Sequence, residues 1–206
     1  MNKPEISDWV SQAKSAFEES INVKKQVIDE HLNVLVDIAV EIAKTIKGGG
    51  CLFLCGNGGS LADAQHLAAE LLVRLRPHVN RRALPALCLA TDMSSVTACG
   101  NDYSFEEIFS RSLEGLGEKG DIVLGISTSG KSKNVIRAFE KAKEMEIKTI
   151  GFLGCGGGAI ANLSDIAFVV PSSATARIQE THITAGHVVM EFVEDMLCSN
   201  GYMSIE

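Results

Sequence analysis

The sequence predicts a doubly wound α/β domain, in which a five-stranded parallel sheet is flanked by helices on both faces. Five short apolar segments are spread along the 206 residues, and segments of helical composition separate them. Strands buried on both faces are apolar throughout, and parallel strands need a long crossover, usually a helix, between them. No internal repeat, linker or low-complexity stretch divides the chain. We therefore expect one domain over residues 1–206.

The chain is expected to begin with a long helical segment over residues 4–47, with a break near residues 19–22. Apolar residues recur at helical spacing over residues 27–46. They form a broader face than a lone surface helix needs. We therefore expect residues 1–47 to take part in oligomerisation, with an ordinary core helix as the alternative. Three glycines, residues 48–50, end the segment.

The first strand, residues 51–54, leads into a glycine-rich loop, residues 56–60. Glycine adopts backbone angles that other residues avoid, which allows the tight turn. Ser60 is the expected N-cap of a helix over residues 61–72. Because the first N–H groups of a helix have no partner within it, this loop suits an anion or a polar sugar.

Two groups with metal-binding and acid–base chemistry stand on this helix. His66 and Glu70 are four residues apart, so they share one face. His187, on the expected last helix, is a third candidate, and three such groups fit a catalytic zinc. The other histidines, His31, His78 and His182, are expected to be structural.

The remaining elements continue the alternation of strands and helices. Strands are expected at residues 86–90, 120–127, 148–153 and 166–170. Helices are expected up to Thr97 after the second strand and over residues 105–116, 134–145 and 175–197. In an open parallel sheet, ligands bind at the carboxyl ends of the strands.

The loop after the third strand matches the nucleotide-binding pattern GxxxxGK[ST] over residues 125–132. A phosphate monoester is the favoured ligand nevertheless. Gly125 falls inside the expected strand, and hydroxyl side chains fill the loop. Asp92 is only a weak candidate for the aspartate that these ATPases place at another strand end. Hydroxyls and helix N–H groups can bind a phosphate without lysine or Mg²⁺. An ATPase is the minor alternative.

Composition excludes several other classes. The net charge of −7 and the pI near 5.3 argue against a nucleic-acid partner. The N-terminus lacks signal-peptide character and no apolar run reaches 18 residues, so we expect no membrane partner. The six cysteines include no CxxC pair. We expect them to be buried, reduced thiols in a cytoplasmic protein.

Five motifs, taken together and in order, resemble the phosphoheptose isomerases, a family of the sugar-isomerase (SIS) fold group with a flavodoxin-like sheet. The motifs are Gly-Asn-Gly-Gly-Ser at 56–60, His66 with Glu70, Asn101-Asp102, the hydroxyl loop 127–132, and Gln179 with His187. The resemblance covers nearly the whole chain. It implies isomerisation of sedoheptulose 7-phosphate to D-glycero-D-manno-heptose 7-phosphate, which supplies heptose to lipopolysaccharide or another surface polysaccharide.

The resemblance also implies the site residues. One zinc ion per subunit would be held by His66, Glu70, Gln179 and His187. Glu70 and His187 would be the catalytic base and acid. The sugar phosphate would contact Asn57, Gly58, Gly59, Glu70, Asn101, Asp102, Ser127, Thr128, Ser129, Ser132 and Gln179. Lys131 departs from the family pattern, which often has a small polar residue there.

The family further implies a homotetramer. Gln179 and His187 are eight residues apart, about 12 Å along a helix. If both are helical, one subunit has great difficulty bringing both to one ion. We therefore predict active sites shared between subunits. The alternative is that Gln179 precedes the helix and one chain supplies every ligand.

Three alternative functions are compatible with a scaffold of this kind. A non-catalytic replication-initiator-associating protein shares the scaffold, but it lacks the counterparts of Ser129 and His187, which are present here. A sugar-phosphate-sensing regulator would be joined to a DNA-binding segment, which these 206 residues do not contain. An isomerase of another ketose phosphate remains open.

Overall fold

The computed structural model describes residues 6–199 and 201–203 and contains a parallel sheet of five strands in the order β2-β1-β3-β4-β5. The strands are β1 (Leu52–Gly56), β2 (Ala86–Cys88), β3 (Ile122–Ser127), β4 (Lys148–Leu153) and β5 (Ile166–Val169). This is the flavodoxin-like order. The predicted doubly wound α/β fold is confirmed.

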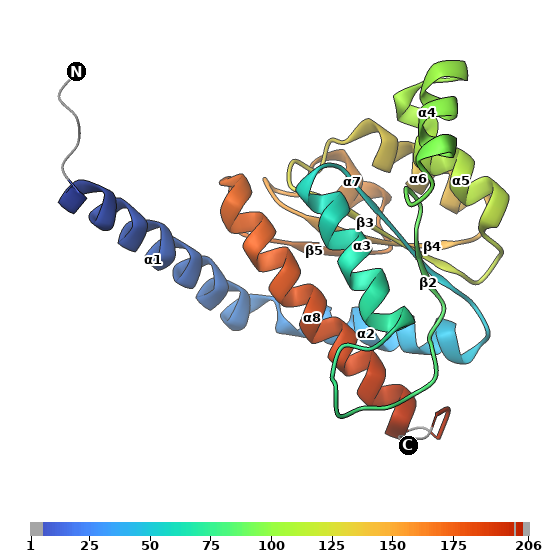
Figure 1. Ribbon diagram of the computed structural model, residues 1–206, viewed down its shortest axis with the longest axis horizontal. Helices are drawn as coiled ribbons and strands as arrows, with labels where there is room; N and C mark the ends of the chain where they lie inside the picture. Colours follow the sequence, from blue (N-terminus) through green and yellow to red (C-terminus); the bar gives the residue numbers. More distant parts are fainter. Residues whose placement is uncertain (1–5, 200, 204–206) are drawn as a thin grey trace.

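Helices cover both faces of the sheet (Figure 1). Helices α2, α3 and α8 pack on one face, and α5, α6 and α7 pack on the other. The helices are α1 (Ile6–Glu30), α2 (Leu32–Lys47), α3 (Gly59–Leu72), α4 (Met93–Asp102), α5 (Ile108–Leu116), α6 (Lys133–Glu144), α7 (Gly158–Leu163) and α8 (Thr175–Ser199), with a 3₁₀ turn η1 (Phe105–Glu107). None of the described helices is both long enough and apolar enough to span a bilayer.

The long N-terminal segment is broken at His31 and not near residues 19–22. The break separates two helices with different surroundings. Helix α2 lies in the core, whereas α1 buries only Val23 and Val27 and projects away from the sheet (Figure 1). The predicted start at residue 4 lies outside the described residues.

One other local prediction was wrong, and one helix was missed. Helix α3 begins two residues earlier than expected, because Gly58 takes a positive φ of 56° and is the N-cap, so Ser60 lies buried within the first turn. Helix α7 was not predicted. Gly156 and Gly157, with φ of 75° and 85°, form the turn that leads into this helix.

The cysteine prediction is partly corrected. All six thiols are free, but only Cys55 and Cys88 are fully buried. Cys155 is exposed, because the glycine-rich turn after β4 carries it to the surface with a positive φ of 50°.

The ends of β1 and β3 form the switch point of the sheet. These strands are neighbours, and Gly56 at the end of β1 pairs with Ile126 near the end of β3. The chain leaves β1 towards β2 and leaves β3 towards β4, so the two following loops diverge and leave a crevice. The glycine loop and the hydroxyl loop are the two sides of this crevice.

A buried ion pair joins the end of α3 to α8. The Arg81 guanidinium donates to a carboxylate oxygen of Glu194 at 2.6 Å, and neither side chain is exposed. Arg81 also donates to the carbonyls of Glu70 and Leu71 at the end of α3. Arg76 donates to the second carboxylate oxygen of Glu194. This network fixes the distance between the two helices.

Replacing Glu194 with glutamine should lower the free energy of unfolding by about 3–5 kcal/mol, because the buried Arg81 charge loses its partner. Denaturant unfolding at fixed protein concentration measures the change. Asp195→Asn is the matched control, since Asp195 also pairs with Arg76 but is 60% exposed. The control should cost no more than about 1 kcal/mol. Equal effects of the two substitutions would contradict this role of the pair.

Candidate active site and metal centre

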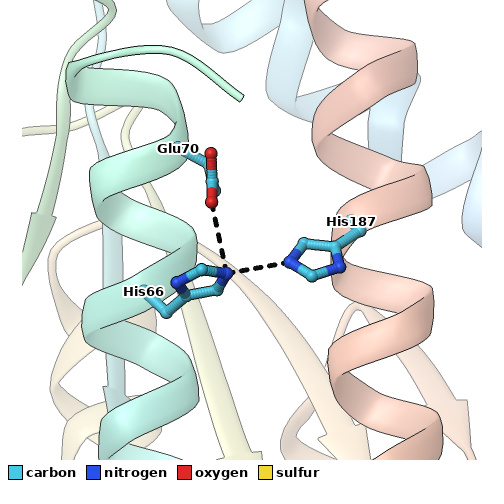
Figure 2. A group of neighbouring side chains, drawn as sticks. All are labelled: His66, Glu70 and His187. Carbon is cyan, nitrogen blue, oxygen red and sulfur yellow. Dashed lines mark hydrogen bonds and ion pairs between the residues drawn. The ribbon is translucent and has the colours of Figure 1, made fainter. Parts of the chain in front are cut away.

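His66, Glu70 and His187 point towards one another across the α3–α8 contact (Figure 2). The Nε2 atom of His66 lies 3.2 Å from a carboxylate oxygen of Glu70 and 2.8 Å from Nε2 of His187. One ligand atom from each residue lies within 4.8 Å of the other two. We call these three residues the His-Glu-His group.

The group forms because α3 and α8 run side by side in the same direction. Gly186 packs directly on Leu67, and a β-carbon on Gly186 would lie 2.6 Å from a methyl carbon of Leu67. A side chain at this position would force the buried Leu67 to shift. The residues that follow and precede this contact, His187 and His66, are thereby brought together. The buried Arg81–Glu194 pair holds the same helices further along.

The donor chemistry fits a divalent transition metal. Two imidazoles and one carboxylate are one of the ligand sets of catalytic zinc sites, which leave a fourth position open to water or substrate. Glu70 is mostly covered, with 15% of its side chain exposed, whereas 48% of the His66 side chain is exposed. A substrate can therefore approach the group from solvent.

Asp63 is a further carboxylate beside this group, and it was not predicted from the sequence. Burial raises the pKa of Asp63, while the nearby His66 and His187 act in the opposite direction. One of its oxygens is buried and has no hydrogen-bond partner among the described residues. Its spacing of three residues before His66 was the only available signal. A carboxylate in this position can orient metal-binding imidazoles.

Gln179 lies apart from the His-Glu-His group. It is helical, as part of α8, and its amide sits against Gly59, where a β-carbon would lie 2.5 Å from the side-chain nitrogen. Gly59 precedes His66 by seven residues, about 10 Å along α3. Within one chain, Gln179 therefore borders the glycine loop and does not reach the group.

The hydroxyl loop is compact and faces the start of α6. The Ser127 hydroxyl lies 2.9 Å from that of Ser132 and 3.5 Å from that of Ser129. Ser132 is the N-cap of α6 but makes no side-chain capping bond. These hydroxyls lie beside the start of α6, whose first N–H groups have no acceptor in the preceding turn, and together they can bind one anion. Thr128, half-buried, completes the predicted set.

Gly125 and Asp92 have structural roles that disfavour an ATPase. Gly125 lies in the middle of β3, where a β-carbon would clash with Phe139 and Val135 at 2.7 Å. It is therefore not the first glycine of a phosphate-binding loop. Asp92 is the N-cap of α4 and accepts hydrogen bonds from the backbone of Ser94 and Ser95.

Asn101 and Asp102 end α4, a helix without buried residues that packs on η1 and α5. The Asn101 amide donates to the Asp102 carboxylate at 2.8 Å. The structure therefore places this pair on an exposed helix and not within the His-Glu-His group.

The remaining histidines lie outside the group. His182 is structural, as predicted: it is fully buried and its Nε2 lies 3.0 Å from the Leu153 carbonyl. Burial lowers the pKa of His182 to about 4, so its ring is neutral at pH 7. His31 stands at the break between α1 and α2, and His78 is exposed after α3.

The sequence of this chain is similar to those of known proteins. The SIS domain model matches residues 17–154. The phosphoheptose isomerase of Aquifex aeolicus is 49% identical over 92% of this chain and 98% of its own length. That of Aneurinibacillus thermoaerophilus is 43% identical over 98% of this chain and 100% of its own.

Solved structures agree with these relatives. The phosphoheptose isomerase of Neisseria gonorrhoeae superimposes with a TM-score of 0.86 at 38% identity, covering 91% of this chain and 99% of that one. The enzyme of Francisella tularensis gives a TM-score of 0.87 at 35% identity, covering 90% and 98%.

Proposed function

The chain belongs to the phosphoheptose isomerase family of SIS-domain proteins, and we propose that it converts sedoheptulose 7-phosphate to D-glycero-D-manno-heptose 7-phosphate. It is thus an aldose–ketose isomerase of a sugar phosphate. The observation that carries the proposal is the His-Glu-His group on α3 and α8, the helix pair that also borders the glycine loop.

The reaction moves a proton from C1 to C2 through an enediol. Glu70 is the base that takes the proton from C1, and His187 is the acid that supplies one to C2. His66 lies between them and within contact distance of both. A zinc ion bound by these residues would polarise the C2 carbonyl and favour negative charge on its oxygen. A metal-bound carboxylate would be a weaker base, so this role requires the Glu70 carboxylate to be free when it takes the proton.

The substrate phosphate is assigned to the hydroxyl loop, Ser127, Thr128, Ser129 and Ser132. Asn57, Gly58 and Gly59 are assigned to the sugar, because the glycine loop forms the other side of the crevice. Gln179 is assigned to the sugar and the metal ion of a site shared with another subunit. Asn101 and Asp102, which lie on the exposed α4, would complete the substrate contacts. These assignments are supported by the position of both loops at the switch point of the sheet.

We also propose one zinc ion per subunit and a homotetramer in the cytoplasm, with the product directed to lipopolysaccharide or another surface polysaccharide. Exposed apolar residues on α1 support assembly: Trp9 is 57% exposed and Phe17 is 74% exposed. A helix with such a face is typical of a protein–protein contact. No nucleic-acid partner is proposed, given the net charge of −7.

A panel of five- to seven-carbon ketose phosphates, with product identification by NMR, tests the proposed substrate. We expect sedoheptulose 7-phosphate to have the highest kcat/KM. A higher value for a shorter ketose phosphate would shift the assignment to another isomerase. Tight, Mg²⁺-dependent ATP binding would instead favour the ATPase alternative.

Replacing Ser129 with alanine should raise KM for the sugar phosphate by one to two orders of magnitude. A hydrogen bond to a charged group contributes about 1.5–3 kcal/mol, and Ser129 offers one to the phosphate. Steady-state kinetics measure the change. Ser112→Ala is the control, because the Ser112 hydroxyl donates to the Ile108 carbonyl within α5, away from the hydroxyl loop. An unchanged KM for the Ser129 variant would contradict the assignment of the substrate phosphate to this loop.

A further inference from the structure

A pair of amide side chains joins the glycine loop to the first turn of α6, which follows the hydroxyl loop. Asn57 follows β1, and Asn134 lies in the first turn of α6. The Asn57 amide nitrogen donates to the Asn134 oxygen at 2.9 Å, and the Asn134 nitrogen donates to the Asn57 oxygen at 2.8 Å. Asn134 is 3% exposed. The bridge lies at the switch point and joins two segments that are far apart in sequence.

The orientation of both amides is fixed by a third contact. The backbone N–H of Val135 donates to the Asn134 oxygen at 3.0 Å. Since only the oxygen of an amide accepts such a bond, Asn134 must present its nitrogen to the Asn57 oxygen. Asn57 then keeps one amide hydrogen and one lone pair free for a ligand. A buried, reciprocal bridge of this kind restricts the position of the loop that carries Asn57.

We propose that Asn134 is a positioning residue. It holds the Asn57 amide at a fixed distance from the serines that bind the substrate phosphate. The inference rests on the proposed function, in which Asn57 binds the sugar and the serines bind its phosphate. Asn134 follows Ser132 by two residues in the same helical turn. Asn134 therefore sets the distance between Ser132, which binds the phosphate of the substrate, and Asn57, which binds its sugar.

The sugar end of the substrate depends on this distance more than the phosphate does. Proton transfer requires the reacting carbon atoms to lie close to the base and the acid, and a misplacement of 1 Å can cost about 100-fold in rate. The serines and the start of α6 do not need Asn57 to bind phosphate. Loss of the bridge should therefore affect kcat strongly and phosphate affinity little.

The substitution Asn134→Leu tests the proposal, because leucine has a similar volume and forms no hydrogen bond. We expect kcat for sedoheptulose 7-phosphate to fall about 10- to 100-fold, as misplaced reacting groups would cause. Inhibition by inorganic phosphate should be unchanged. Asn162→Ala, which removes an exposed amide on α7, is the control and should leave kcat unchanged.

The same substitution is then repeated in an Asn57→Ala background. If Asn134 acts through Asn57, the added loss in kcat should be less than about threefold, because coupled residues are not additive. An equal loss in both backgrounds would overturn the proposal. Asn134→Asp, which keeps the shape but cannot donate when ionised, supplies a second cycle if the leucine variant melts early. A wild-type protein inactive on every ketose phosphate would refute the proposed function itself, before either cycle is interpreted.

Discussion

The substitution Glu70→Gln is expected to lower kcat by at least roughly 10²- to 10⁴-fold, the contribution of a positioned base. Glutamine keeps the size of the side chain and can still contact an ion, but it cannot take the proton from C1. Substrate binding should survive, because the glycine and hydroxyl loops are unchanged. The fall should therefore appear in kcat and not in the dissociation constant of the substrate.

Two controls separate the loss of the base from other effects of this substitution. The zinc content of the variant, measured by elemental analysis, should remain close to that of the wild type, since His66 and His187 are retained. Glu114→Gln, on the exposed part of α5, should have full activity. An active Glu70→Gln enzyme with bound metal would show that another group is the base.

Mixed oligomers of Gln179→Ala and His187→Ala chains are expected to regain activity that neither variant has alone. The structure places His66, Glu70 and His187 in one chain, whereas Gln179 of that chain lies two turns away beside Gly59. If Gln179 reaches the metal of another subunit, each site needs an intact His-Glu-His group from one chain and an intact Gln179 from a second chain. Each condition is met in half of the cases, so random mixing restores about a quarter of the sites. Subunit exchange followed by an activity assay measures the recovery.

Mixtures of His66→Ala with His187→Ala chains are the matched control. Both residues belong to the His-Glu-His group of a single chain, so no mixed site contains the complete group. This mixture should remain inactive. If the Gln179→Ala mixture also stays inactive, Gln179 acts on the glycine loop of its own chain and the prediction of shared sites is wrong.

The sheet could be predicted from the sequence because its strands are buried on both faces. Their apolar runs, such as residues 148–153, coincide with the observed strands within a few residues. The break at His31 could not be located, because the apolar spacing continues into α1 although that helix leaves the core. Helix α7 was missed because local glycine content, and not tertiary packing, guided the prediction.

The site was predictable only where its residues are neighbours in sequence or belong to a recognised motif. The spacing of His66 and Glu70 identified their shared face. The contact of Gly186 with Leu67, the Arg81–Glu194 pair and the Asn57–Asn134 bridge join segments far apart in the chain. No local periodicity records such contacts. For the same reason, the position of Gln179 beside Gly59 could not be predicted from the sequence, because it depends on how α3 and α8 pack.

The wild-type reaction in deuterated water is the most direct test of isomerisation by proton transfer. Sedoheptulose 7-phosphate is incubated with the enzyme, and NMR identifies the product and its isotope at C2. The proposed mechanism predicts D-glycero-D-manno-heptose 7-phosphate with solvent deuterium at C2, since the acid exchanges its proton with water. A product with no deuterium at C2 under any condition would contradict it and indicate hydride transfer.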